Sequence, residues 1–114
     1  MRRALTIGTL ALAAACVAAP AHAIESTADL RDVCAGEDEA SRNFCFGYIK
    51  GAGHLYIELV RADVIPQIAC ADPVPTMEVI RVSVVEWIDA NPQHADDRAI
   101  DGLLRASAEI WPCE

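Results

Sequence analysis

The 114-residue sequence has little that would support metal, haem or enzymatic chemistry. Its cysteine pairs lack C-x-x-C spacing, which argues against zinc sites and excludes C-x-x-C-H haem attachment. His54 precedes Glu58 by four residues, but no nucleophile, metal cluster or second carboxylate is placed with this pair. We therefore expect no catalytic residue, no metal site and no cofactor.

Basic residues are also scarce. Nine Lys and Arg stand against seventeen Asp and Glu, and the net charge of −8 becomes −10 without the two arginines at the N-terminus. Such an acidic surface argues against nucleic acid and anionic membranes as partners. It is compatible with a basic protein partner, although a solvated acidic surface with no partner is the commoner explanation.

Long apolar runs are missing except at residues 4–19, which follow those two arginines and precede a small-x-small Ala-His-Ala sequence. This layout predicts a secretory signal peptide at residues 1–23, cleaved after Ala23. The alternative is a retained membrane anchor, but the run is too short to span a bilayer stably. We expect a single exported domain at residues 24–114, located in the periplasm and not inserted in the membrane after cleavage.

This domain has the spacing and termini of four helices. We expect them at residues 27–34, 39–62, 77–90 and about 95–111, with a proline-containing loop at 64–75. The predicted buried stripe of the second helix comprises Tyr48, Ala52, Leu55, Leu59 and Ala62. Residues 79–85 are rich in β-branched side chains, so a strand is the alternative there. The predicted class is all-α, a small four-helix bundle.

Four cysteines remain after the signal peptide, and an even number in an exported chain indicates two disulfides. Cys34 ends the first helix close to Cys45 near the start of the second. Two antiparallel reversals would return Cys113 to the end of the second helix, where Cys70 follows. Pairing Cys45 with Cys70 would require a loop to retrace roughly 25 Å of helix. The predicted staples are therefore Cys34–Cys45 and Cys70–Cys113.

The segment CFGYIKGAG at residues 45–53 places Gly47 and Gly51 one turn apart. A phosphate-binding loop is excluded, because the segment does not connect a strand to a helix N-terminus. Glycine inside a helix costs up to about 1 kcal/mol relative to alanine, so a close helix contact is the expected compensation. We predict a helix-packing contact at Gly47, Tyr48 and Gly51, made either with another helix of the chain or with a second subunit.

Several of these features occur together in one known family. The order is L-x-x-V-C, an acidic loop, C-x-G-Y-I-x-G, a cysteine followed by prolines, W-I-x-x-x-P and a terminal I-W-P-C. This pattern resembles the Rap/Tai family of immunity proteins associated with type VI secretion, over nearly all of residues 24–114. The chain departs from it at His54, where the family often has aspartate, and in its longer Cys70–Pro73 spacing.

The resemblance implies a small, helical, disulfide-bonded periplasmic protein without enzyme activity. Such a protein binds and occludes one secreted effector protein, in characterised cases a peptidoglycan amidase, and a homodimer is a further expectation. We predict that the partner contacts the connection between the third and fourth helices, through Asp89, Asn91, Pro92, Gln93, His94 and Asp96. The segment at residues 66–68 is the second choice.

A function of a different class fits the same features. A small acid-activated periplasmic chaperone would also be helical, exported, acidic and disulfide-bonded. Acid would protonate its carboxylates, loosen the fold and expose apolar surface to many clients. An immunity protein would instead bind one partner near neutral pH.

Overall fold

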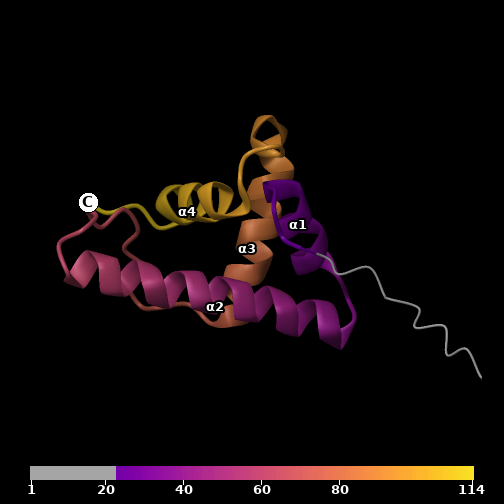
Figure 1. Ribbon diagram of the computed structural model, residues 1–114, viewed down its shortest axis with the longest axis horizontal. Coiled ribbons are helices and arrows are strands. Elements are labelled where there is room, and N and C mark those ends of the chain that lie inside the picture. The colour runs from indigo at the N-terminus through magenta and orange to yellow at the C-terminus, as the bar shows by residue number, and fades with distance from the viewer. Residues whose placement is uncertain (1–22) are drawn as a thin grey trace, which may run out of the picture.

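Four α-helices and one short 3-10 helix form the described part of the chain, residues 23–114 of the computed structural model (Figure 1). In chain order they are α1 (Thr27–Ala35), α2 (Glu39–Arg61), α3 (Met77–Ala90), the 3-10 helix η1 (Pro92–His94) and α4 (Ala99–Ile110). Residues 23–114 contain two isolated β-bridges and no strand, so the predicted all-α class is confirmed. The predicted signal peptide lies, except for Ala23, outside the described residues.

Side-chain caps define the starts of the first three helices. The Ser26 hydroxyl accepts the Asp29 N–H at 3.1 Å, and the Asp29 carboxylate accepts the Ser26 N–H at 2.8 Å, which is a capping box. Asp38 and Thr76 accept backbone N–H groups in the first turns of α2 and α3. These three helices therefore begin at the positions predicted from the polar residues that precede each apolar pattern.

The structure corrects two expectations for the later part of the chain, one at residues 79–85 and one at the start of α4. Residues 79–85 lie within α3, so the strand alternative is wrong. α4 begins at Ala99 rather than at residues 95–97, because the chain after α3 first forms η1 and a turn. α4 has no side-chain cap, and the Ala99 N–H instead donates to the backbone carbonyl of Glu25 at 2.9 Å.

α1 and α3 form the centre of the packing, since each of them contacts the three other α-helices. The long α2 lies along one side of the molecule, α3 crosses its direction, and α4 runs outward from α3 (Figure 1). Cys45 and Ile49, the buried residues of α2, both lie in its first half. The core contains Leu30, Cys34, Cys45, Ile49, Val84, Trp87, Ile88, Ala99, Leu103 and Ala106.

Both predicted disulfides are present. Cys34 and Cys45 have Cα atoms 5.0 Å apart, and those of Cys70 and Cys113 are 4.9 Å apart. The route differs from two antiparallel reversals, because the loop after α2 itself turns back along the helix before α3 starts (Figure 1). α4 then runs out toward this loop, which brings Cys113 to Cys70.

α1 and α4 meet at Thr27 and Gly102. Thr27 is fully buried, and its hydroxyl donates to the backbone carbonyls of Asp97 at 3.1 Å and Arg98 at 3.2 Å. A Cβ added to Gly102 would overlap the Thr27 side chain. Glycine at position 102 therefore allows the two helices to approach closely.

The predicted buried stripe of α2 is partly wrong. Tyr48 and Ala52 pack against the core and Leu59 is half-buried, but Leu55 is 62% exposed and Ala62 is exposed. The physical reason is that the end of α2 extends beyond the helices that cover its beginning (Figure 1). Apolar spacing alone does not show where a covering helix stops.

Candidate functional site

The loop predicted to bind a partner lies between α3 and α4, at one end of the molecule (Figure 1). Most of its polar side chains are engaged within the chain. Asp89 accepts two hydrogen bonds from Arg31, at 2.8 and 3.3 Å, and Asn91 donates to the Trp87 carbonyl at 2.8 Å. Gln93 donates to the Asn91 side chain at 3.2 Å.

The remaining predicted loop residues differ in exposure. His94 Nδ1 lies 2.7 Å from Asp97 Oδ2, and its ring stacks on Trp87 with centroids 5.6 Å apart. Pro92 and Asp96 are exposed. The loop is therefore held in one shape by internal contacts, and it presents few unengaged polar groups to a partner.

The bond between Arg31 and Asp89 also shifts the titration of both groups. Hydrogen bonding to Arg31, followed by its charge, holds the pKa of Asp89 below the ordinary value of 3.8, while the pKa of Arg31 is raised. Both groups are solvent-exposed, which limits how strongly the pair stabilises the fold.

The predicted helix-packing residues of α2 do not share one environment. Tyr48 is half-buried and packs against the core, and burial together with the charge of Asp101 raises the pKa of its hydroxyl. Gly47 and Gly51 are exposed, and a Cβ added to either would meet no atom within 4 Å. No helix of the described chain uses these two glycines for a close approach.

An apolar groove of about 390 Å³ lies beside this part of α2. Its lining residues, from the end of α1 and the first turns of α2, are Asp32, Val33, Ala40, Ser41 and Phe44. We call it the α1–α2 groove. Phe44 is 52% exposed although it is among the largest apolar side chains of the domain. The sequence interpretation missed this residue, although Phe44 lies three and seven residues before the two glycines and therefore on the same side of the helix.

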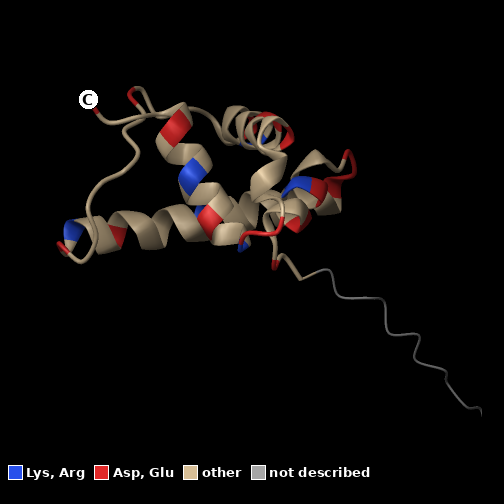
Figure 2. Ribbon diagram, turned by 90° about the horizontal axis from the view of Figure 1, so that it is seen from above, with Lys and Arg blue, Asp and Glu red and all other residues tan. Residues whose placement is uncertain are grey.

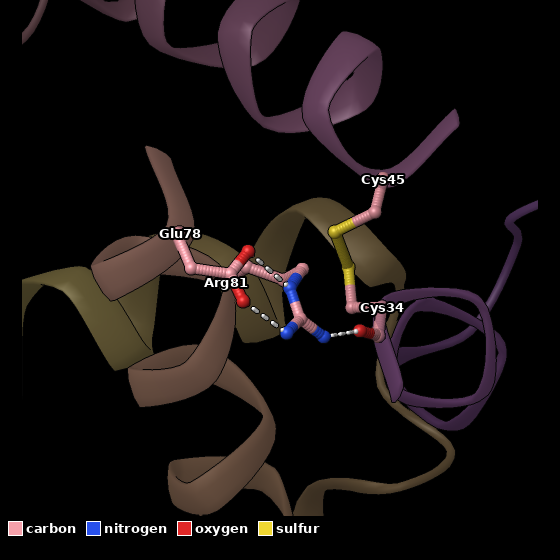
Figure 3. Close-up of a disulfide and its surroundings, with 4 residues drawn as sticks. All are labelled: Cys34, Cys45, Glu78 and Arg81. Atoms are coloured by element: carbon pink, nitrogen blue, oxygen red, sulfur yellow. Dashed lines mark hydrogen bonds and ion pairs between the residues drawn. A yellow bond between two sulfur atoms is a disulfide. The ribbon is translucent and has the colours of Figure 1, made fainter. Parts of the chain in front are cut away.

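The walls of the α1–α2 groove are fixed by covalent and ionic contacts. The disulfide between Cys34 and Cys45 joins α1 to α2, and the Arg81 guanidinium donates to the Cys34 carbonyl at 2.5 Å (Figure 3). Arg81 also donates to both carboxylate oxygens of Glu78, at 2.6 and 2.9 Å, and its side chain is only 12% exposed. The guanidinium places a positive charge at the C-terminal end of α1, which favours that helix.

A second groove, of about 420 Å³, lies between α4 and the loop after α2. Its lining residues are Ile68, Asp101, Leu104, Arg105, Ala108 and Glu109. Asp101 is paired with Arg98, and Glu109 accepts the Trp87 indole N–H at 2.7 Å. Its lining therefore carries both charge signs, and two of its carboxylates already have partners.

The described surface has an excess of unpaired carboxylates. Five arginines form ion pairs with carboxylates, and in Figure 2 basic positions are few among the acidic ones. The paired arginines are Arg31, Arg42, Arg61, Arg81 and Arg98. Among residues 23–114, no cluster of three His, Cys, Asp or Glu side chains is arranged to hold a metal ion. Nor is any helix in this part both long and apolar enough to cross a membrane.

Comparison with known protein families gives a match over nearly the whole domain. The model of a family described as Rap1a immunity proteins matches residues 26–113, which is most of the chain and nearly all of the described domain. No curated protein and no solved structure matches.

Proposed function

The chain belongs to the Rap1a immunity protein family, and from this premise we propose that it is a periplasmic immunity protein that binds one secreted effector and occludes the effector's active site. The effector is a type VI secreted toxin, most simply a peptidoglycan amidase or a related cell-wall hydrolase. The immunity protein contributes no chemistry of its own. The observation that carries the proposal is the family match over residues 26–113.

Export follows from the same proposal. A toxin that attacks peptidoglycan acts outside the cytoplasm, so its inhibitor has to be there too. Disulfides form and persist in oxidising compartments such as the periplasm, and this domain has two of them. We propose that residues 1–23 are a signal peptide and that the domain starting at residue 24 acts in the periplasm.

The construction of the domain suits an inhibitor that works by occlusion. Two disulfides, three side-chain caps and the Arg81 bridge hold its surfaces in place before a partner arrives. A surface that is already ordered loses less conformational entropy on binding, which raises affinity without new contacts. The candidate contact surfaces are the loop at residues 89–97, the segment at residues 66–68 and the α1–α2 groove.

The test is inhibition of a purified effector. Each secreted cell-wall hydrolase encoded beside the gene would be assayed on peptidoglycan with increasing amounts of the oxidised chain. We expect hydrolysis to stop near a one-to-one ratio at neutral pH. Failure to inhibit or bind any of these hydrolases would contradict the proposal.

A parallel capture from periplasmic extract, at about pH 7 and about pH 3, separates the immunity role from a chaperone role. One stoichiometric partner near neutral pH supports the immunity protein. Many unfolded clients captured only in acid would indicate the chaperone.

A further inference from the structure

We propose that the effector docks on the outer face of α2 and in the α1–α2 groove beside it, through a positively charged helical segment that carries a bulky apolar side chain. The outer face of α2 is defined as Phe44, Gly47, Gly51 and Leu55. The inference rests on the proposed function, since it names the contact surface and the chemistry of the same partner.

The first observation is an unpartnered apolar surface on α2. Phe44 is 52% exposed and Leu55 is 62% exposed, and both follow the helical spacing of the two glycines between them. Together with an apolar groove beside Phe44, they give this side of α2 the apolar character of an interaction surface. The α1–α2 groove extends this surface with an apolar floor of Val33, Ala40 and the Phe44 ring.

The second observation is the open space at the glycines. Gly47 and Gly51 each weaken α2 by up to about 1 kcal/mol relative to alanine. Among residues 23–114 nothing compensates for this loss, because no atom of this part of the chain approaches the places where their Cβ atoms would be. Without side chains at these positions, the backbone of a second helix can come unusually close. A helix lying against α2 would place its own bulky apolar residue in the groove beside Phe44.

The third observation is the charge around the groove. The Asp32 side chain is 75% exposed. Glu37, in the turn before α2, and Glu39, the first residue of α2, are exposed too. Arg31 lies near Asp32 but bonds more closely to Asp89, at 2.8 against 3.5 Å. The rim of the groove is therefore negative, and a partner segment with Lys or Arg residues complements it.

The same charge argues against a second copy of this chain on the face. Residues 24–114 have a net charge of −10, so the net charges of two copies repel one another as they approach. The loop at residues 89–97 is a weaker candidate, because a partner would have to break its internal hydrogen bonds to use the polar side chains. A cationic segment at the acidic rim of the α1–α2 groove is attracted by Asp32, Glu37 and Glu39 and breaks none of the loop's hydrogen bonds.

The first experiment measures inhibition of the effector by three variants of the full oxidised chain. Gly47→Gln with Gly51→Gln places long side chains in the open space, and Phe44→Ser removes the ring. Val74→Ser, which changes an exposed apolar residue of the loop after α2, is the loop control. Glutamine is a good helix former, so the first variant should remain folded, which circular dichroism checks. We expect the α2 variants to weaken inhibition by about tenfold or more, equivalent to about 1.4 kcal/mol, and the loop control to change it less than about twofold. Unchanged inhibition in the α2 variants would overturn the docking surface while leaving the immunity function intact.

A second experiment needs no effector and therefore distinguishes the two proposals. Random helix-length peptides displayed on phage would be selected on the oxidised full chain at neutral pH. We expect selected peptides rich in Lys and Arg, whose binding weakens with added salt and is lost in the two α2 variants. Acidic peptides, peptides that bind elsewhere, or no selected peptides would overturn the surface. Dimerisation that disappears in Gly47→Gln with Gly51→Gln would overturn it too, because a second copy would then be the occupant.

Discussion

Gly102 in α4 and the pair Gly47 and Gly51 in α2 are glycines inside helices, but their surroundings are opposite. A Cβ at Gly102 would overlap Thr27, whereas a Cβ at either α2 glycine would meet no atom of residues 23–114 within 4 Å. The contact between α1 and α4 explains the first glycine from within the chain. The outer face of α2 gives no internal reason for the other two. Gly102 therefore serves the packing of the fold, and the open space at Gly47 and Gly51 is the feature on which the proposed docking surface depends.

Removing the disulfide that joins the loop after α2 to the end of α4 should have the largest effect on stability. The disulfide between Cys70 and Cys113 connects the loop after α2 to the end of α4 across 43 residues. In the chain-entropy model, Cys70→Ser with Cys113→Ser should lower the free energy of unfolding by up to about 4 kcal/mol. Urea denaturation of the oxidised proteins measures this value. An unchanged midpoint would contradict a stabilising role for the bridge.

The next largest effect should come from filling the tight contact. Gly102→Ala forces a methyl group against Thr27, so we expect a loss of about 2 kcal/mol after allowing for the better helix propensity of alanine. Thermal and urea unfolding would show it. Adding Thr27→Ala should make the pair of substitutions less damaging than the sum of the two single changes. Exact additivity would show that Gly102 and Thr27 do not constrain one another.

Glycine-to-alanine substitutions on the outer face of α2 should change the stability in the opposite direction. Gly47→Ala and Gly51→Ala should each raise the free energy of unfolding by about 0.5–1 kcal/mol, because alanine favours the helix and has room for its methyl group. The same unfolding measurements apply, with Gly102→Ala as the matched control. Destabilisation at positions 47 and 51 would remove the contrast between the two regions.

The smallest effect concerns acid and the exposed ion pairs. Hydrogen bonding to Arg31 lowers the pKa of Asp89, and hydrogen bonding to Arg81 lowers the pKa of Glu78. A carboxylate whose pKa is lower in the folded protein stabilises it above the unfolded pKa and loses this contribution as the pH falls through the folded value. Stability should therefore decline as the pH drops below about 4.

Asp89→Asn is the check on this acid effect. Unfolding measured across the acid range should depend less on pH in the variant than in the unmodified chain. Identical pH dependence in both proteins would show that the pair with Arg31 contributes nothing measurable, which is a common result for exposed ion pairs.

Much of the fold was predictable from residues whose effects are local. Ser26, Asp38 and Thr76 cap helices through their own first turns, and the prolines between positions 64 and 75 interrupt regular structure whatever surrounds them. The disulfide pairing was also predictable, although α3 crosses α2 rather than returning alongside it. The predicted pairing required only that the end of α4 come close to the loop after α2. Several arrangements of the helices satisfy that condition.

The candidate surface was harder to predict, because it depends on where covering elements stop. Leu55 continues the apolar spacing of Tyr48 and Ala52, yet it lies in water on the outer side of α2. Phe44 precedes Cys45 in the sequence and faces another direction, since neighbouring residues on a helix point about 100° apart. Sequence spacing identifies the sides of a helix that are apolar, but only the packed neighbours decide which side is covered.

The hydrogen bonds between the start of α1 and the chain before α4 bear on how the protein is made. The N–H groups of Thr27 and Ala28 donate to the carbonyls of Asp97 and Ala95, and the Thr27 hydroxyl reaches a carbonyl 70 residues away. These partners are synthesised only after α1, α2 and α3. An N-terminal fragment therefore lacks the groups that hold its first helix in place, and the domain matures only when almost the whole chain has emerged.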